Sequence, residues 1–255
     1  MSKSASKKGI ALAVIFFVVL VIWQAPATLV VWAIKQQVPD IEVRLVGGTV
    51  WRGQLGLVDW PTGNDPLQLD KIHWRLNALS LLSLSPSAYV ELASGPNTLS
   101  GTFKVSASQA LQVTGLELAF NGEFLRNFVP ALVDGLFTAN IPSMLVRNQK
   151  IEALEGVIEW QQGAVTAGTG QIPLGDFQAL LDEDAKGGFY ATLMDMGGPV
   201  GLNGSLNADL QRSYSIQSII TLRAEADPQL NEWLPLFTLQ RSADEYFFVA
   251  SGSYR

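Results

Sequence analysis

The residues best suited to catalysis or metal binding are few and scattered in this sequence. His73 is the only imidazole, and the chain contains no cysteine. A catalytic or zinc-binding histidine needs partners, such as a second histidine, a thiolate or an orienting carboxylate. His73 lies in an alternating stretch, on the opposite parity from Ile72 and Trp74, which indicates the polar face of a strand. We therefore predict no nucleophilic or zinc chemistry at this residue.

The densest group of carboxylates is Asp182-Glu183-Asp184, which is followed by Lys186-Gly187-Gly188. A calcium loop of the EF-hand type needs acids at alternate positions and a glutamate at its twelfth, and this spacing is absent. We predict that the cluster is a solvated loop. Paired carboxylates that meet only in the folded chain, as in glycoside hydrolases, are not visible in a sequence.

Two further motifs of active sites are missing. Ala250-Ser251-Gly252-Ser253 is not the Gly-x-Ser-x-Gly elbow of serine hydrolases. Gly201-Leu202-Asn203-Gly204 lacks the Lys-Ser/Thr pair and the following helix of a phosphate loop. We therefore expect that the protein is not an enzyme, and we assign no catalytic, cofactor-binding or metal-binding residue and no cofactor.

The elements that would position any site are predicted to be β-strands. Within 199–211, apolar and polar residues alternate with a period of two, as in a strand with one apolar face. Turn-forming residues interrupt the chain roughly every ten residues. The fold class is predicted to be mainly β, with a mostly antiparallel sheet that forms two similar β layers or one curled sheet. Further strands are predicted over 46–60 (a hairpin turning near Gly53), 69–76, 102–108, 111–120 (with a bulge at Gly115), 151–160, 164–172, 190–194, 214–226 and 246–254.

Little helix is predicted. Asp227-Pro228 has the form of an N-cap followed by a proline in the first turn, which indicates a helix over 229–234. Residues 175–181 are predicted to form one or two helical turns. The segment 123–137 is ambiguous, because Pro130 argues against one continuous helix. A seam within the β-rich region is placed at 137–149.

The first 34 residues differ from the rest. Three lysines precede an apolar run, and 9–34 supplies roughly the 20 apolar residues that cross a bilayer. The positive-inside rule then predicts a cytoplasmic tail at 1–8, a transmembrane anchor at 9–34 and a periplasmic β-rich domain at 35–255. The alternative is a cleaved signal peptide, since Ala25-Pro26-Ala27 has the form of a cleavage site. The apolar run resumes after Ala27, which favours the uncleaved anchor in the inner membrane.

The region beyond the predicted anchor is acidic. It holds all 23 acidic residues and 14 of the 17 lysines and arginines, an excess of nine acidic residues. We therefore expect no binding of nucleic acid through a basic face. Among the tryptophans, Trp51, Trp60, Trp74 and Trp160 are predicted to pack on strands, and Trp32 fits the aromatic belt at the outer interface of the membrane.

Several short motifs follow one another in a recognisable order. They are Gly48-Thr49-Val50-Trp51-Arg52-Gly53, Ile72-His73-Trp74-Arg75-Leu76, Gly156-Val157-Ile158-Glu159-Trp160, and the runs at 198–204 and 222–230. Together with the basic tail and the apolar segment, this set resembles the type II secretion system protein N (GspN) family over nearly the whole chain. The resemblance implies an accessory inner-membrane component that supports the export of folded proteins from the periplasm across the outer membrane. Its partners would be other secretion components in the inner membrane and periplasm, and it brings no catalytic residues.

Two mechanisms remain open for such a domain. In the first, an unprotected strand edge pairs with a strand of another secretion component or of the exoprotein cargo. In the second, the sheet curls into a trough whose apolar face carries lipid acyl chains, as in AsmA-like proteins. A protein-binding module should fill its core with its own large side chains, whereas a lipid carrier should leave a continuous apolar groove.

Overall fold

The strands form a single antiparallel sheet. The computed structural model of the 255-residue chain describes residues 13–14, 16–17, 20–61, 67–125, 133–167, 170–210 and 213–253. The 14 strands of the sheet follow chain order from β1 to β12, after which β14 pairs with β12 and β13 lies outermost. The strands are β1 (Glu42–Gly48), β2 (Arg52–Trp60), β3 (Leu67–Leu76), β4 (Ser87–Ser94), β5 (Asn97–Val105), β6 (Leu111–Asn121), β7 (Val133–Arg147), β8 (Lys150–Ala167), β9 (Gly170–Glu183), β10 (Phe189–Asp195), β11 (Val200–Ala208), β12 (Ser213–Leu222), β13 (Leu239–Gln240) and β14 (Glu245–Ser253).

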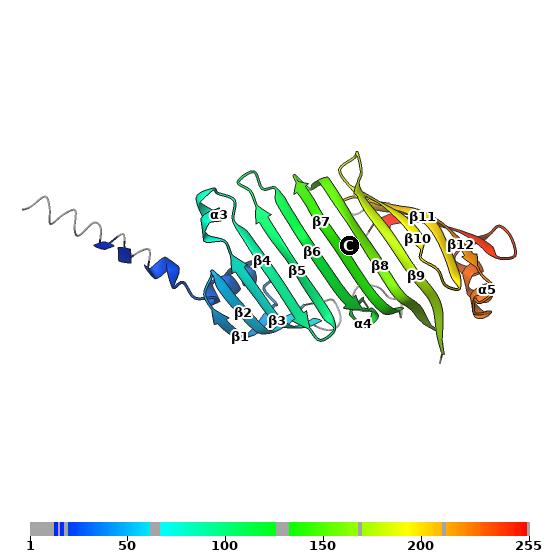
Figure 1. The fold of residues 1–255 in the computed structure, drawn as a ribbon, viewed down its shortest axis with the longest axis horizontal. Coiled ribbons are helices and arrows are strands. Elements are labelled where there is room, and N and C mark those ends of the chain that lie inside the picture. Colours follow the sequence, from blue (N-terminus) through cyan, green and yellow to red (C-terminus); the bar gives the residue numbers. More distant parts are fainter. Residues whose placement is uncertain are drawn as a thin grey trace, which may run out of the picture.

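Short helices lie at the ends and turns of the sheet (Figure 1). They are α2 (Thr28–Gln37), α3 (Ala78–Leu82), α4 (Gly122–Leu125), α5 (Gln229–Trp233) and the 3-10 helix η1 (Leu234–Leu236). The predicted start of α5 is confirmed, since the Asp227 carboxylate accepts a hydrogen bond from the Gln229 N–H at 2.9 Å.

The sheet is curled. Val165 of β8 and Ile172 of β9 share one apolar cluster with Leu222 of β12 and Tyr246 of β14. In a flat sheet, strands four or five places apart would lie about 20 Å from each other. The last strands must therefore turn back over the middle, and Figure 1 shows the red C-terminal strand behind the green and yellow ones. Of the two predicted arrangements, the structure has the single curled sheet.

Three local predictions are wrong. The first hairpin turns at 49–51 rather than near Gly53, because Gly53 lies opposite Trp74, whose ring leaves no room for a Cβ. Strand β8 continues through 161–163, where its register shifts, and the single strand predicted over 164–172 is instead the end of β8 and the start of the antiparallel β9. Residues 175–181 belong to β9 and not to a helix. The expected bulge at Gly115 is confirmed: Gly115 has a φ of 58°, and the pairing of β5 with β6 shifts register beside it.

Residues 137–149, where a seam was placed, lie in β7 and in the turn that leads to β8. Strand β7 pairs with β6 on one side and with β8 on the other. The sheet is therefore continuous through this range.

The N-terminal apolar segment is interrupted. Residues 20–23 are helical, the chain leaves the helix at Gln24, and α2 begins at Thr28. In the described part of the chain, no helix combines the length and the apolarity that crossing a bilayer requires. Much of the range 9–23 lies outside the described residues. The end of the predicted anchor, 29–34, instead belongs to α2, whose Val31 is buried against the sheet.

Residues 25–27, the alternative signal-peptide cleavage site, are bonded to the sheet. Pro26 forms a β-bridge with Thr49. The Val50 N–H donates to the Ala25 carbonyl at 2.9 Å, and the Ala27 N–H donates to the Gly48 carbonyl at 3.1 Å. These bonds attach the N-terminal segment to the turn between β1 and β2.

Candidate functional site: the concave face of the sheet

The concave face carries a continuous apolar row. Seven residues follow one another in register across β4 to β10, and they are Leu92, Leu99, Leu118, Ala139, Ile158, Ala179 and Leu193. Strand periodicity explains the row, because each strand contributes every second side chain to the same face. Only Ala139 is buried, and the others are half-buried. The described residues thus leave the middle of the concave face partly open.

A ladder of aromatic rings crosses the same face. Phe120, Phe137, Trp160 and Phe177 come from four neighbouring strands, and successive ring centroids lie 5.7, 5.2 and 5.4 Å apart. The Trp160 indole N–H donates to the Asp134 carbonyl at 2.9 Å. The one polar atom of the ladder is therefore paired, and the ladder offers a hydrocarbon surface.

Helices close both ends of this face. At the N-terminal end, Ala27 and Val31 pack on Leu55, Val58 and Trp74. At the C-terminal end, Leu230 of α5 packs on the cluster around Tyr246. The side chains of both clusters point to the side toward which the sheet curls. We call the concave face between these two clusters the trough.

The packing beneath α2 is incomplete. A cavity of about 350 Å³ lies between α2 and strands β2 to β4, and all thirteen side chains that line it are apolar. The Trp74 indole N–H donates to the Val50 carbonyl at 2.9 Å, so it offers no free donor. We call this space the α2 cavity. Its lining suits hydrocarbon, because a polar group placed there would lose its hydrogen bonds to water.

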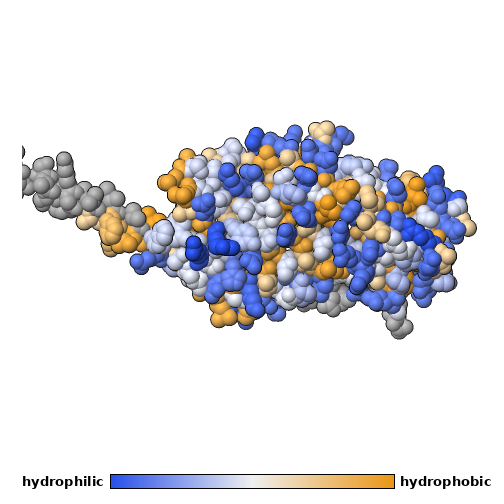
Figure 2. Space-filling view, viewed as in Figure 1, coloured by the Kyte–Doolittle hydropathy of each residue, from blue (hydrophilic) through white to orange (hydrophobic). Residues whose placement is uncertain are grey.

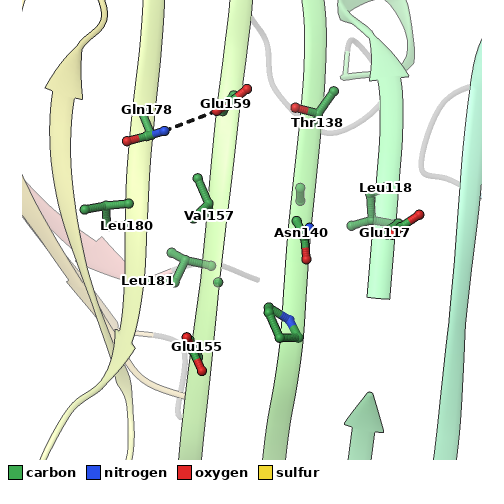
Figure 3. Close-up of a pocket in the computed structure, with 13 residues that line it drawn as sticks. Glu117, Leu118, Thr138, Asn140, Glu155, Val157, Glu159, Gln178, Leu180 and Leu181 are labelled. Atoms are coloured by element: carbon green, nitrogen blue, oxygen red, sulfur yellow. Dashed lines mark hydrogen bonds between the residues drawn. The ribbon is translucent and has the colours of Figure 1, made fainter. Parts of the chain in front are cut away.

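The convex face is polar by comparison. An open depression of about 750 Å³ lies over β6 to β9, and Figure 3 shows its side chains. Gln178 donates to Glu159 at 3.1 Å across neighbouring strands. Glu155 and Glu159 lie on one face of β8 with Val157 between them, so their Cα atoms are about 13 Å apart.

The acidic cluster singled out in the sequence lies at the end of β9. Glu183 accepts a hydrogen bond from the Leu154 N–H at 3.2 Å, which lowers the pKa of the Glu183 carboxyl. His73 lies exposed on β3, in register between Gln54 and Glu91. Among the described residues, no three histidine, aspartate or glutamate side chains converge as a metal site would require.

A second charged group fixes a turn. Arg223 donates to the Asp195 carboxylate and to the Gly198 carbonyl, both at 2.6 Å, and Asp195 also accepts from the Leu202 N–H at 3.0 Å. Desolvation raises the pKa of Asp195, but the hydrogen bonds and the Arg223 charge outweigh it, and the pKa lies below its ordinary value. These contacts hold the turn between β10 and β11, and we assign them a structural role.

Sequence reasoning left the trough open as one of two mechanisms, but it named none of the residues that line it. The signal was present as the apolar parity of each strand, but the same pattern also describes an ordinary filled core. Two features thus remain as candidates: a trough that could hold hydrocarbon, and the strand edges at its ends.

The fold and its surfaces define the structural class of this protein. It is a meander of antiparallel strands that forms one curled sheet with an apolar concave face. A family model described as type II secretion system (T2SS), protein N, matches residues 39–249. A curated relative, the type II secretion system protein N of Aeromonas hydrophila, is 25% identical over 240 residues, which cover 90% of this chain and 92% of the relative. No solved structure matches. The chain belongs to the type II secretion system protein N family.

Proposed function

We propose that the protein is an accessory component of a type II secretion system that acts by binding and not by catalysis. An N-terminal apolar segment anchors it in the inner membrane with its N-terminus in the cytoplasm, and the curled sheet lies in the periplasm. The family match supports the secretion role. The exposed side chains of Phe16, Phe17 and Trp23, each about two-thirds accessible, support the anchor.

The observation that carries the binding mechanism is the difference between the two edges of the sheet. Edge strand β1 carries Glu42 and Arg44 and contains Leu45 at a φ of 57°. Charge and backbone irregularity both discourage the addition of a strand. Beyond Phe247, no described strand pairs with the outer side of β14, and residues 246–253 contain neither charge nor proline.

Apolar side chains gather beside this second edge. Leu236, Phe237 and Leu239 are about 70% exposed, and Val249 of β14 is half exposed. We call β13, β14 and these side chains the C-terminal edge. A strand of another secretion component would gain main-chain hydrogen bonds from β14 and would cover the apolar side chains.

Cysteine cross-linking tests this proposal, because the chain has no cysteine of its own. Full-length protein with Val249→Cys is expected to cross-link to single cysteines in the periplasmic domains of other components of the same system. The matched variant at the other edge, Leu45→Cys, is expected not to. Equal cross-linking from both edges, or from neither, would contradict the mechanism.

A charge placed on the C-terminal edge provides a functional readout. Val249→Lys is expected to reduce exoprotein release, because strand addition would then bury a charge. Asn203→Lys, on the exposed face of β11, is the control and should leave release unchanged. Normal release by the Val249→Lys variant would argue against binding at this edge.

A second candidate function is supported by the half-buried apolar row and the α2 cavity. We propose that the trough can hold acyl chains. Mass spectrometry of lipid extracted from the purified full-length protein tests this, and Ile158→Asp, in the middle of the row, is expected to lower the amount bound. If extracts of the unmodified protein contain no lipid beyond that of the detergent blank, the trough does not act as a carrier.

A further inference from the structure

Four leucines around α3 form an exposed patch. Leu79, Leu82 and Leu84 are 74%, 84% and 71% exposed, and Leu81 is also exposed. None of the residues of α3 is buried. We call these four residues the leucine patch. Such a concentration of exposed apolar side chains within six residues indicates a surface that is covered in the working state of the protein.

The patch is held in a defined conformation. The Asn77 side chain accepts from the Leu79 N–H at 3.1 Å and caps α3. The Ser80 hydroxyl donates to the Asn77 carbonyl at 2.5 Å and accepts from the Ser87 N–H at 2.9 Å. The loop is thus fixed by its own hydrogen bonds while its leucines point away from the sheet.

A chain of contacts links the patch to the N-terminal helical segment. The Trp51 indole N–H donates to the Ile22 carbonyl at 2.9 Å, and the rings of Trp51 and Trp23 stack with centroids 6.4 Å apart. The Leu76 N–H donates to the Trp51 carbonyl at 2.8 Å, and α3 begins two residues later. In Figure 2 the apolar side chains of α3 lie at the end of the molecule from which the N-terminal segment leaves.

The surroundings of the patch indicate what covers it. From Leu76 to Val90 the chain has no charged residue, and its polar side chains are mainly serine hydroxyls. An uncharged, leucine-rich loop can enter the boundary between lipid head groups and acyl chains without the cost of desolvating a charge. Trp23 and Trp51 supply the aromatic side chains that favour this depth.

We infer that the leucine patch inserts into the membrane leaflet from which the N-terminal segment emerges, and so fixes the sheet against the bilayer at its β1–β4 end. This inference rests on the proposed anchor. A single apolar segment would leave the domain free to rotate and tilt. A second contact, joined to the first through Trp51, removes that freedom and orients the trough relative to the membrane. The insertion requires no anionic lipid, because the loop carries no charge.

Fluorescent probes on single cysteines test the inference in full-length protein reconstituted into phosphatidylcholine vesicles that contain a brominated quenching lipid. An environment-sensitive fluorophore is attached to Leu82→Cys, to Phe17→Cys in the apolar segment, and to Leu236→Cys at the opposite end of the sheet, where the side chain is 73% exposed against 84% for Leu82. The probes at 17 and 82 are expected to be quenched, and the probe at 236 is expected not to be. Added anionic lipid or salt should leave the quenching at 82 unchanged.

The possible outcomes distinguish failure of this inference from failure of the proposed membrane anchor on which it rests. Quenching at 17 without quenching at 82 would overturn membrane docking of the patch and leave the anchor intact. Absence of quenching at both positions would overturn the anchor as well. In a second variant, Leu79→Asp and Leu84→Asp are combined with the probe at 82, and quenching at 82 is expected to fall to the level seen at 236. Unchanged quenching in this variant would also overturn the inference.

Discussion

The two ends of the sheet are closed in different ways. At the C-terminal end, the sheet curls over itself and α5 completes the cluster, in which Tyr246 and Ile172 are almost wholly buried. At the N-terminal end, α2 lies on the first strands and leaves a cavity of about 350 Å³. Close packing stabilises a region through many small contacts, and a void loses them. The C-terminal end is therefore the more closely packed of the two, and the N-terminal end contains unfilled apolar space.

The strongest test of this comparison removes the centre of the C-terminal cluster. Tyr246→Ala is expected to lower the free energy of unfolding by about 3–5 kcal/mol, because it leaves a cavity among packed side chains. Denaturation in urea measures the change. Tyr246→Phe is the control, since it loses only the hydrogen bond to Asn231 and should cost about 1 kcal/mol. Equal costs for the two variants would show that the ring is not the centre of the cluster.

A smaller effect is expected at the ion pair of Arg223 with Asp195, which holds the turn between β10 and β11. Arg223→Ala removes the partner of Asp195 and should cost about 1 kcal/mol at neutral pH, because the pair is partly exposed. The lowered pKa of Asp195 means that its contribution exists above the ordinary pKa and is lost as the pH falls through the lowered one. The difference between variant and parent should therefore begin to shrink as the pH falls below about 4, down to the part that comes from the Gly198 carbonyl contact of Arg223, which does not titrate.

The control for this pair is Arg241→Ala, at the exposed contact of Arg241 with Glu245 at 3.4 Å. Its free energy of unfolding should match that of the parent at every pH where the proteins fold. If the Arg223→Ala deficit persists unchanged in acid, the turn between β10 and β11 is held by something other than this ion pair.

The smallest change is expected at the N-terminal end. Ala88 lines the α2 cavity, and Ala88→Leu places three more carbon atoms in it. Stability should rise or fall by less than about 1 kcal/mol, whereas overpacking of a filled core costs about 1–3 kcal/mol. Thermal unfolding measures this, and Ala191→Leu at a wholly buried alanine of β10 is the filled-core control. Similar losses of stability in Ala88→Leu and Ala191→Leu would contradict the difference in packing between the two ends.

Most strands could be predicted from the sequence, although β4, β7 and much of β9 were not. The role of glycine could not be predicted either. Gly48 has a φ of 85° and lies at the first turn, whereas Gly53 lies within β2 because the Trp74 ring packs against its backbone. Both residues interrupt an apolar pattern in the same way. A sequence does not distinguish a glycine that turns the chain from one that admits a neighbouring ring.

The candidate site was predictable only in part, because openness is a property of the whole sheet. The alternation in β11 and β12 correctly predicts which side chains face inward. Whether the inward side chains fill the interior of the curled sheet depends on how far the sheet curls. The degree of curl is set by contacts between distant strands, such as those between β9 and β14. The leucine patch was not predicted, although the sequence signals it by a stretch of fifteen residues that contains leucines and no charged residue.

The chain-order pairing of β1 to β12 has a consequence for how such molecules diversify. A duplicated hairpin inserted at any of these turns would replace one existing strand pairing with three new ones, and every other pair would keep its register. Two added strands preserve the alternation of direction and of apolar parity, and they lengthen the trough by about 10 Å. Descendants of one ancestral gene can therefore differ in span while keeping the same termini.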